Sequence, residues 1–202
     1  MRVSSGPRAF EGTNPVNKKL AAAMSGGAVL MLVLSGCSGD ETDEKASAWA
    51  KKVCDQWQPE LKKIETANAD IKRVASESSK PEDVQKTDSA AFGIMSESYR
   101  TMGAALQSAG IPPAKNGAAT QAAAAKGFES TSKGYADLKA KMDALDPKDQ
   151  PKFADGLKEV AGGLQEATKG GQDALAQLNA GGLDKAINNQ KGCQVATAPA
   201  PQ

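Results

Sequence analysis

The chain has 202 residues, with 25 Lys or Arg, 24 Asp or Glu and no His. The absence of His removes the commonest general base and the commonest metal ligand, and no block of Lys and Arg is present that could neutralise the phosphates of a nucleic acid. We therefore expect no catalytic site, no metal, no cofactor and no nucleic-acid partner.

Residues 1–36 have the composition of a secretory signal. Its parts follow in the usual order, with a basic pair, an apolar run, two small residues and a cysteine at Lys18-Lys19, Leu20–Leu34, Ser35-Gly36 and Cys37. The run is shorter than the about 20 apolar residues of a membrane-spanning helix, and small residues interrupt it at 25–27. An ordinary signal peptide and a single span remain as alternatives. Because the signal is complete from Val16, we expect translation to start there, unless residues 1–15 form a long basic region.

The sequence Leu34-Ser35-Gly36-Cys37 resembles the lipobox of bacterial lipoproteins. The resemblance implies that the Cys37 sulfur receives a diacylglyceryl group and that Cys37 becomes the first residue after cleavage. Two acyl chains hold a protein stably at a membrane, whereas one holds it only marginally. We therefore expect a protein whose membrane contact is a lipid anchor on the extracytoplasmic face of the bacterial cell membrane.

Two further cysteines, Cys54 and Cys193, follow the signal. An even pair in an oxidising compartment is most simply a disulfide. Two free thiols and a metal site are the alternatives, although two thiolates without His make a poor zinc site.

Residues 37–44 are polar and acidic, and we expect a solvated tether between the lipid and a helical domain at 45–193. A calcium site is the alternative, but the ligand spacing of a known calcium loop is absent. Apolar positions at steps of three and four then predict a first helix over about 42–76. Pro59 should kink or split this helix because proline removes a backbone donor.

Capping signals divide the rest of the chain. Ser79 with Glu82 resembles a capping box and predicts a second helix from there to about Ala109. A third helix is expected over about 114–145, and Asp146-Pro147 should begin the fourth. We expect one long fourth helix that continues across Gly170-Gly171 and ends at Gly181-Gly182, with two helices as the alternative. A short helix at 183–189 and a disordered tail at 194–202 should follow.

Helices of similar length joined by short turns favour antiparallel neighbours. The predicted fold class is all-α, an antiparallel up-down-up-down four-helix bundle with a kinked first helix and a C-terminal segment tied by the disulfide. In this arrangement the fourth helix ends where the first begins, so the following segment would bring Cys193 alongside Cys54.

Large aromatic residues alternate with Ala and Gly on the predicted core faces. Five of them are the candidate ligand-binding residues, because a core that mixes large and small side chains could leave a void: Trp57, Phe92, Tyr99, Phe128 and Tyr135. The alternative is that the rings fill the core themselves. The spacing of Trp57 from Trp49 favours burial over a ligand platform.

Several segments beside the lipobox look like small secreted lipoproteins of actinomycete bacteria. They are Trp49–Asp55, Pro81–Phe92, Lys152–Leu157 and Gly192-Cys193, within a similarity that covers most of 16–193. The family has no assigned biochemical activity, so the resemblance implies a location and the cysteine pair and supplies no catalytic residues. The sequence departs from the family mainly before Val16.

Three classes of function are compared. An enzyme without His would need a carboxylate pair or a Ser-Lys dyad, and no nucleophile elbow or phosphate-binding loop is present. We expect a structural or interaction module that acts on an envelope protein or the cell wall. The alternative is a lipoprotein that binds a small amphiphilic ligand in the bundle core.

Overall fold

The computed structural model describes residues 38–75 and 78–197, and the predicted signal, Cys37 and residues 198–202 lie outside this part of the chain. The described residues form helices and no strand, so the all-α prediction is confirmed. The elements are α1 (Ser38–Val74), α2 (Pro81–Ser108), α3 (Gly117–Asp143), α4 (Gln150–Ala180), α5 (Asp184–Asn188) and the 3-10 helix η1 (Lys191–Thr197).

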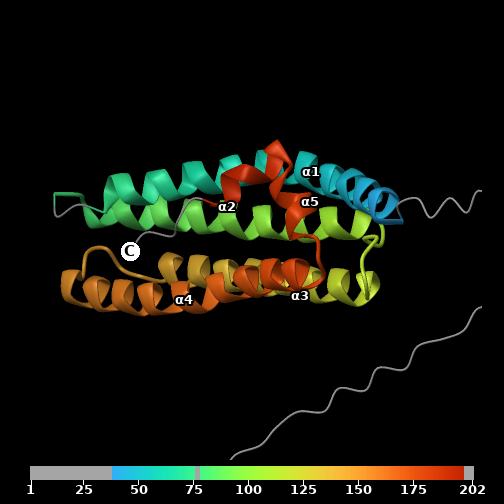
Figure 1. The fold of residues 1–202 in the computed structure, drawn as a ribbon. Helices are drawn as coiled ribbons and strands as arrows, with labels where there is room; N and C mark the ends of the chain where they lie inside the picture. Colours follow the sequence, from blue (N-terminus) through green and yellow to red (C-terminus); the bar gives the residue numbers. More distant parts are fainter. Residues whose placement is uncertain (1–37, 76–77, 198–202) are drawn as a thin grey trace, which may run out of the picture. The chain divides into compact units, whose positions relative to one another are not determined.

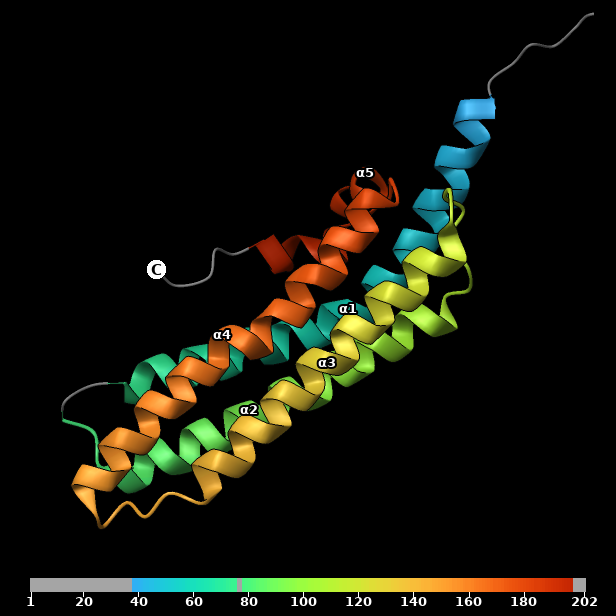
Figure 2. The same cartoon turned by 90° about the horizontal axis from the view of Figure 1, so that it is seen from below.

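The four long helices pack as a bundle in two layers. Figure 1 shows α1 and α2 in one layer and α3 and α4 in the other, and Figure 2 shows the same pairs from the side of α3 and α4. Each long helix packs on the next one along the chain, and α5 and η1 pack on α1. No Cα atom in the described part of α1 lies within 8 Å of one in α3 or α4, so α2 is the long helix whose backbone lies nearest to α1 there.

The core consists of two clusters of buried apolar side chains. The first, which we call the braced cluster, joins α1 to α5 and η1, and its largest members are Trp49, Val53, Trp57, Leu61, Met102, Leu106, Phe128, Leu178, Leu183 and Ile187. The second, which we call the distal cluster, contains no residue of α5 or η1, and its largest members are Phe92, Met95, Tyr135, Leu138, Met142, Phe153 and Val160.

The segment expected as a solvated tether is helical from Ser38 onward, so the first helix begins before its predicted start at about residue 42. Two effects favour the helix in this acidic segment. Carboxylates near a helix N-terminus interact favourably with the helix dipole, and Glu41 forms an ion pair with Lys45 one turn later, at 2.7 Å. α1 also continues through Pro59, so the expected split does not occur.

The starts of three helices differ from the predicted caps. Lys80 is the N-cap of α2, without a side-chain hydrogen bond, and Pro81 is its first residue, so the N-cap lies one residue after the predicted Ser79. α3 begins at Gly117, because Asn116 before it adopts a left-handed backbone with φ 60°. α4 begins at Gln150, three residues beyond the predicted Pro147.

The capping of α4 explains the shift of its start. The Asp149 carboxylate accepts a hydrogen bond from the backbone N–H of Lys152 at 3.3 Å, which satisfies a free donor of the first helical turn. Asp146 instead accepts from the N–H of Lys148 at 3.0 Å. Asp146 therefore closes a turn before the helix and does not cap it.

The C-terminal part contains one confirmed prediction and one error. α4 runs unbroken across Gly170-Gly171 and ends at Ala180, as expected for a single long helix. The tail was expected to be disordered from residue 194, but η1 continues to Thr197. The disulfide at Cys193 and a hydrogen bond from its N–H to the carbonyl of Gln190, at 3.0 Å, hold the chain here and favour this order.

Candidate functional site

The five candidate ligand-binding residues form one continuous series of rings. Trp57 meets Phe128 edge to face at a centroid distance of 5.1 Å. Tyr99 stacks between Phe128 and Tyr135, at 6.1 and 5.6 Å. Phe92 follows Tyr135 at 6.2 Å. These separations are typical of favourable aromatic pairs, which add about 0.5–1.5 kcal/mol each beyond burial.

Four of the rings are buried and Tyr99 is partly buried, and this burial shifts the pKa of the two phenols. Trp57, Phe92 and Phe128 are each 1% exposed, and the indole N–H of Trp57 donates to the carbonyl of Met102 at 3.0 Å. Burial raises the pKa of the Tyr135 hydroxyl, and the neighbouring Tyr99 adds to this effect. Burial also raises the pKa of Tyr99. Both phenols therefore stay neutral at physiological pH.

The structure thus brings all five residues together, and their rings contact one another. Pockets of ≈ 570, ≈ 460 and ≈ 490 Å³ lie elsewhere on the described part of the chain, and none is lined by any of the five rings. Ligand binding by the rings stays a prediction.

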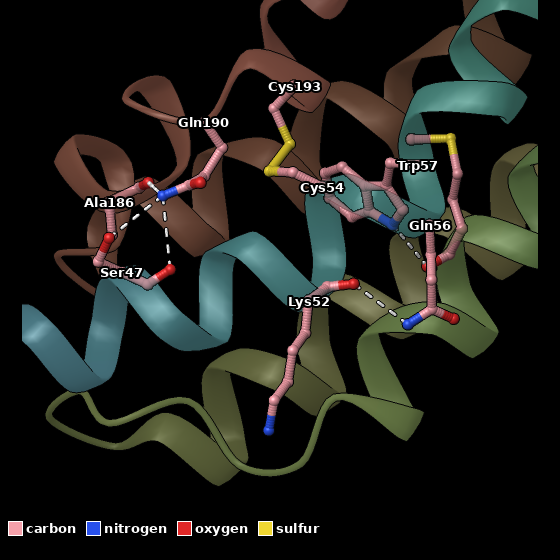
Figure 3. The surroundings of a disulfide bond; sticks show 9 residues. Ser47, Lys52, Cys54, Gln56, Trp57, Ala186, Gln190 and Cys193 are labelled. Atoms are coloured by element: carbon pink, nitrogen blue, oxygen red, sulfur yellow. Dashed lines mark hydrogen bonds between the residues drawn. A yellow bond between two sulfur atoms is a disulfide. The ribbon is translucent and has the colours of Figure 1, made fainter.

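The predicted disulfide between Cys54 and Cys193 is present, with the two Cα atoms 5.1 Å apart, and it joins α1 to η1. Figure 3 shows that the side chain of Gln190 braces the same junction, with its amide N–H groups directed at Ser47 and Ala186. The Gln190 amide donates to the Ser47 hydroxyl at 3.2 Å. The C-terminal segment is therefore held to α1 by a covalent bond and by polar contacts.

Two contacts between α2 and α3 were not predicted. Ser89 donates to the carboxylate of Asp143, and the Lys139 ammonium donates to Asp143 at 2.5 Å and to Ser89 at 3.3 Å. This is the arrangement of Ser and Lys that an enzyme without His would need. The Lys139 ammonium, however, donates to Asp143 and to the Ser89 hydroxyl, so it offers no lone pair to take the Ser89 proton. Ser89 is also only 8% exposed. The cluster therefore joins two helices.

Glycines permit a close approach of α3 and α4. A β-carbon on Gly127 would lie 2.6 Å from the carbonyl oxygen of Gly170, and one on Gly134 would lie 2.9 Å from the Cα of Ala167. The α3–α4 contact therefore depends on these small residues. In the sequence, Gly170 marks only the position at which the fourth helix could divide into two.

The pocket of ≈ 570 Å³ is a surface groove between the end of α1 and the start of α2. Apolar, charged and hydroxyl-bearing residues line it together: Ala67, Val74, Ala90, Ala91 and Ile94, with Asp70, Arg73, Asp83, Lys86, Ser79 and Thr87. Ile94 is 41% exposed, which makes it the largest apolar contact that this groove offers to solvent.

Within the described ranges, no group of three or more acidic, His or Cys side chains is placed to hold a metal ion. None of the helices there has the length and apolar character needed to cross a bilayer. Comparison of the chain with protein-family models, curated proteins and solved structures gives no match.

Proposed function

We propose that the chain is a lipid-anchored lipoprotein of the bacterial cell envelope and that its bundle acts as an interaction module outside the cytoplasm. The sequence up to Cys37 supports the anchor, and the Cys54–Cys193 disulfide supports an oxidising compartment, where such bonds persist. The partner is an envelope protein or the cell wall.

We infer that successive helices run antiparallel, as an up-down-up-down bundle requires. Trp49 donates to the carbonyl of Gly110 at 2.7 Å, and Trp57, eight residues later, donates to that of Met102, eight residues earlier. The glycine contacts of α3 support the same direction for α4, because Gly127 meets Gly170 and the later Gly134 meets the earlier Ala167.

We also propose that α1 bends at Pro59. Proline lacks the N–H that would bond to the carbonyl of Asp55, and its ring crowds that carbonyl, so a helix that continues through proline bends there. The bend would lie between Cys54, which is tied to η1, and the distal part of the helix.

The packing of the aromatic series is the reason why we prefer an interaction through the outer surface to ligand binding in the core. Five rings in mutual contact fill the centre of the bundle, whereas the pockets lie at the surface. The groove between α1 and α2 combines an apolar lining with charges of both signs, which suits a macromolecular partner better than a small apolar ligand.

The anchor is tested by replacing Cys37 with Ser in the native host. We expect Cys37→Ser to lose incorporation of a labelled fatty acid and to leave the membrane fraction. Cys193→Ser is the matched control, because it removes a different cysteine and should keep both properties. A Cys37→Ser protein that stays in the membrane fraction would contradict the lipid anchor.

The interaction module is tested by placing a photoreactive amino acid at Ile94 in living cells. We expect one discrete crosslinked product. A second substitution that reverses the charge of Lys86 should lower its yield. A photoreactive residue at Lys133, which is exposed on α3, is the control. If Ile94 and Lys133 give the same background of products, the groove is not the contact surface.

One observation favours the alternative, a carrier of a small amphiphilic ligand. No Cα atom in the described part of α1 lies within 8 Å of one in α4, and the half-buried Ile64, Ile71, Leu157 and Leu164 pack against the distal cluster. Native mass spectrometry of protein from its own host would show a bound molecule of defined mass if the bundle carries a ligand.

A further inference from the structure

Asp88 is a carboxylate that the packing of the bundle leaves without compensation. It lies on the same face of α2 as Val84 and Phe92, one turn away on either side, and both pack in the distal cluster. Its Oδ1 atom is buried and has no hydrogen-bond partner among the described residues. An ionised carboxylate in such a place loses hydration without gaining a partner, which destabilises the charged form.

The segment of α1 that lies over this part of α2 is held by packing and not by the disulfide. We call residues 60–74 of α1 the distal segment. The hydrogen bonds from Trp49 to Gly110, just beyond α2, and from Trp57 to Met102 advance by equal steps in opposite directions, and the same register places Ile71 opposite Asp88. The ion pair, the hydrogen bond and the disulfide that join α1 to the C-terminal segment, through Asp43, Ser47 and Cys54, all precede Pro59.

Pro59 separates the two parts of α1. Before it, the disulfide and the braced cluster hold the helix on two sides. After it, α2 is the long helix whose backbone lies nearest to α1, and Ile64 and Ile71 are only half-buried. Apolar packing holds this part of α1, through the buried side chains of Leu61, Ala67 and Val74. The missing backbone bond at proline lowers the cost of bending there.

We propose that the distal segment of α1 is a hinged flap that separates from α2 about Pro59 and that Asp88 controls its docking: the protonated side chain favours the docked flap, and the carboxylate favours the open one. Opening hydrates Asp88 and exposes the α1 face of the distal cluster.

The charges around Asp88 do not compensate it. On α1, Asp70 pairs with Arg73 at 3.2 Å, and on α3, Lys139 pairs with Asp143. Tyr135 stays neutral because burial raises its pKa. The buried face of α4 presents apolar side chains, and on α2 itself Asp83 and Lys86 are exposed. Accordingly, desolvation alone raises the Asp88 pKa, to about 6.

The direction of the pH effect follows from this pKa. The docked state binds the Asp88 proton more tightly than the open state, in which a hydrated Asp has its ordinary pKa of 3.8. Docking is therefore favoured at low pH and weakens as pH rises from about 4 to about 6. Above that range the docking equilibrium no longer changes with the titration of Asp88. Because Asp88 is half-buried, we expect roughly a tenfold change in the opening equilibrium between pH 4.5 and pH 7.5.

Hydrogen exchange of the disulfide-bonded protein measures this equilibrium. An isolated segment of about 15 residues is marginally helical in water, so an open flap frays and exchanges its amides. After correction for intrinsic exchange, we expect protection of residues 60–74 to be roughly tenfold lower at pH 7.5 than at pH 4.5. Protection of residues 46–58 should change little.

Three variants make the test specific. Asp88→Asn should abolish the pH difference in residues 60–74, and the control Asp83→Asn, on the exposed side of α2, should retain it. Pro59→Ala should raise protection at pH 7.5. Equal protection at both pH values in the unmodified protein, a pH difference that survives Asp88→Asn, or a Pro59→Ala variant with unchanged protection would overturn the proposal.

Discussion

Gly192 packs against the backbone of Cys54: a β-carbon on Gly192 would lie 2.5 Å from the Cys54 carbonyl oxygen, and a real β-carbon does not come so close. Glycine is thus required beside Cys193 for the disulfide to close with η1 against α1. This contact explains why glycine precedes Cys193 in the sequence.

We predict that Gly192→Ala destabilises the bundle by about 1–3 kcal/mol, because η1 must move away from α1 to make room for the methyl group. Denaturant unfolding measures the change. The control is Gly162→Ala on the exposed side of α4, where a β-carbon would meet nothing within 4 Å. That substitution should stabilise the protein by about 0.5–1 kcal/mol through helix propensity. Equal effects of the two substitutions would contradict the explanation.

Removal of the disulfide should lower stability substantially. The bond joins residues 139 apart, and the chain-entropy model assigns a loop of this size about 4–5 kcal/mol, with less expected where native contacts are strained. We predict that the domain has a clearly lower melting temperature with reductant than without it. Cys54→Ser combined with Cys193→Ser should reproduce the reduced value and remove the response to reductant. Identical melts would show that the bond contributes little.

The close contact of α3 and α4 is testable at Gly170. We expect Gly170→Ala to cost about 1–3 kcal/mol, because its β-carbon would lie 2.7 Å from the Gly127 carbonyl oxygen. The matched change Gly162→Ala, eight residues earlier in the same helix, controls for propensity. A stabilised Gly170→Ala variant would mean that the two helices lie further apart in solution.

Phe128 contacts both Trp57 and Tyr99 and is 1% exposed, so its loss should leave a large cavity in the core. Phe128→Ala is predicted to cost about 3–5 kcal/mol in unfolding free energy, as for other buried aromatic residues. Ile111→Ala, at a side chain that is 67% exposed, should change stability by less than about 0.5 kcal/mol. A small effect at Phe128 would indicate a loosely packed centre with room for a ligand.

Asp88 predicts a pH dependence of global stability. Its folded pKa, about 6, lies above the ordinary 3.8, so its contribution favours folding most at low pH and declines as pH rises between these values. Asp88→Asn should therefore stabilise the protein at pH 7.5 and have much less effect at pH 4.5. Comparison of the variant with the unmodified protein by denaturant unfolding at both pH values removes the contributions of other carboxylates. An effect that does not depend on pH would contradict the raised pKa.

The sequence by itself determined the helices and the cysteine pair. Apolar steps of three and four placed α1 to α4, because only a helix brings such residues onto one face. Cys54 and Cys193 were paired correctly because an oxidising compartment leaves an even pair few alternatives. The continuity of α4 across Gly170-Gly171 also followed from periodicity.

The tertiary structure decided what depends on distances between helices. Local propensity places the caps within a few residues, but whether Ser79 or Lys80 ends the loop depends on how the loop packs. The roles of Gly192 and Gly170 were not visible in the sequence, because a glycine that weakens a helix and one that admits a neighbouring backbone have the same local pattern. Asp88 looks like any surface carboxylate in the chain, and only the packing around α2 shows that its oxygen is buried without a partner.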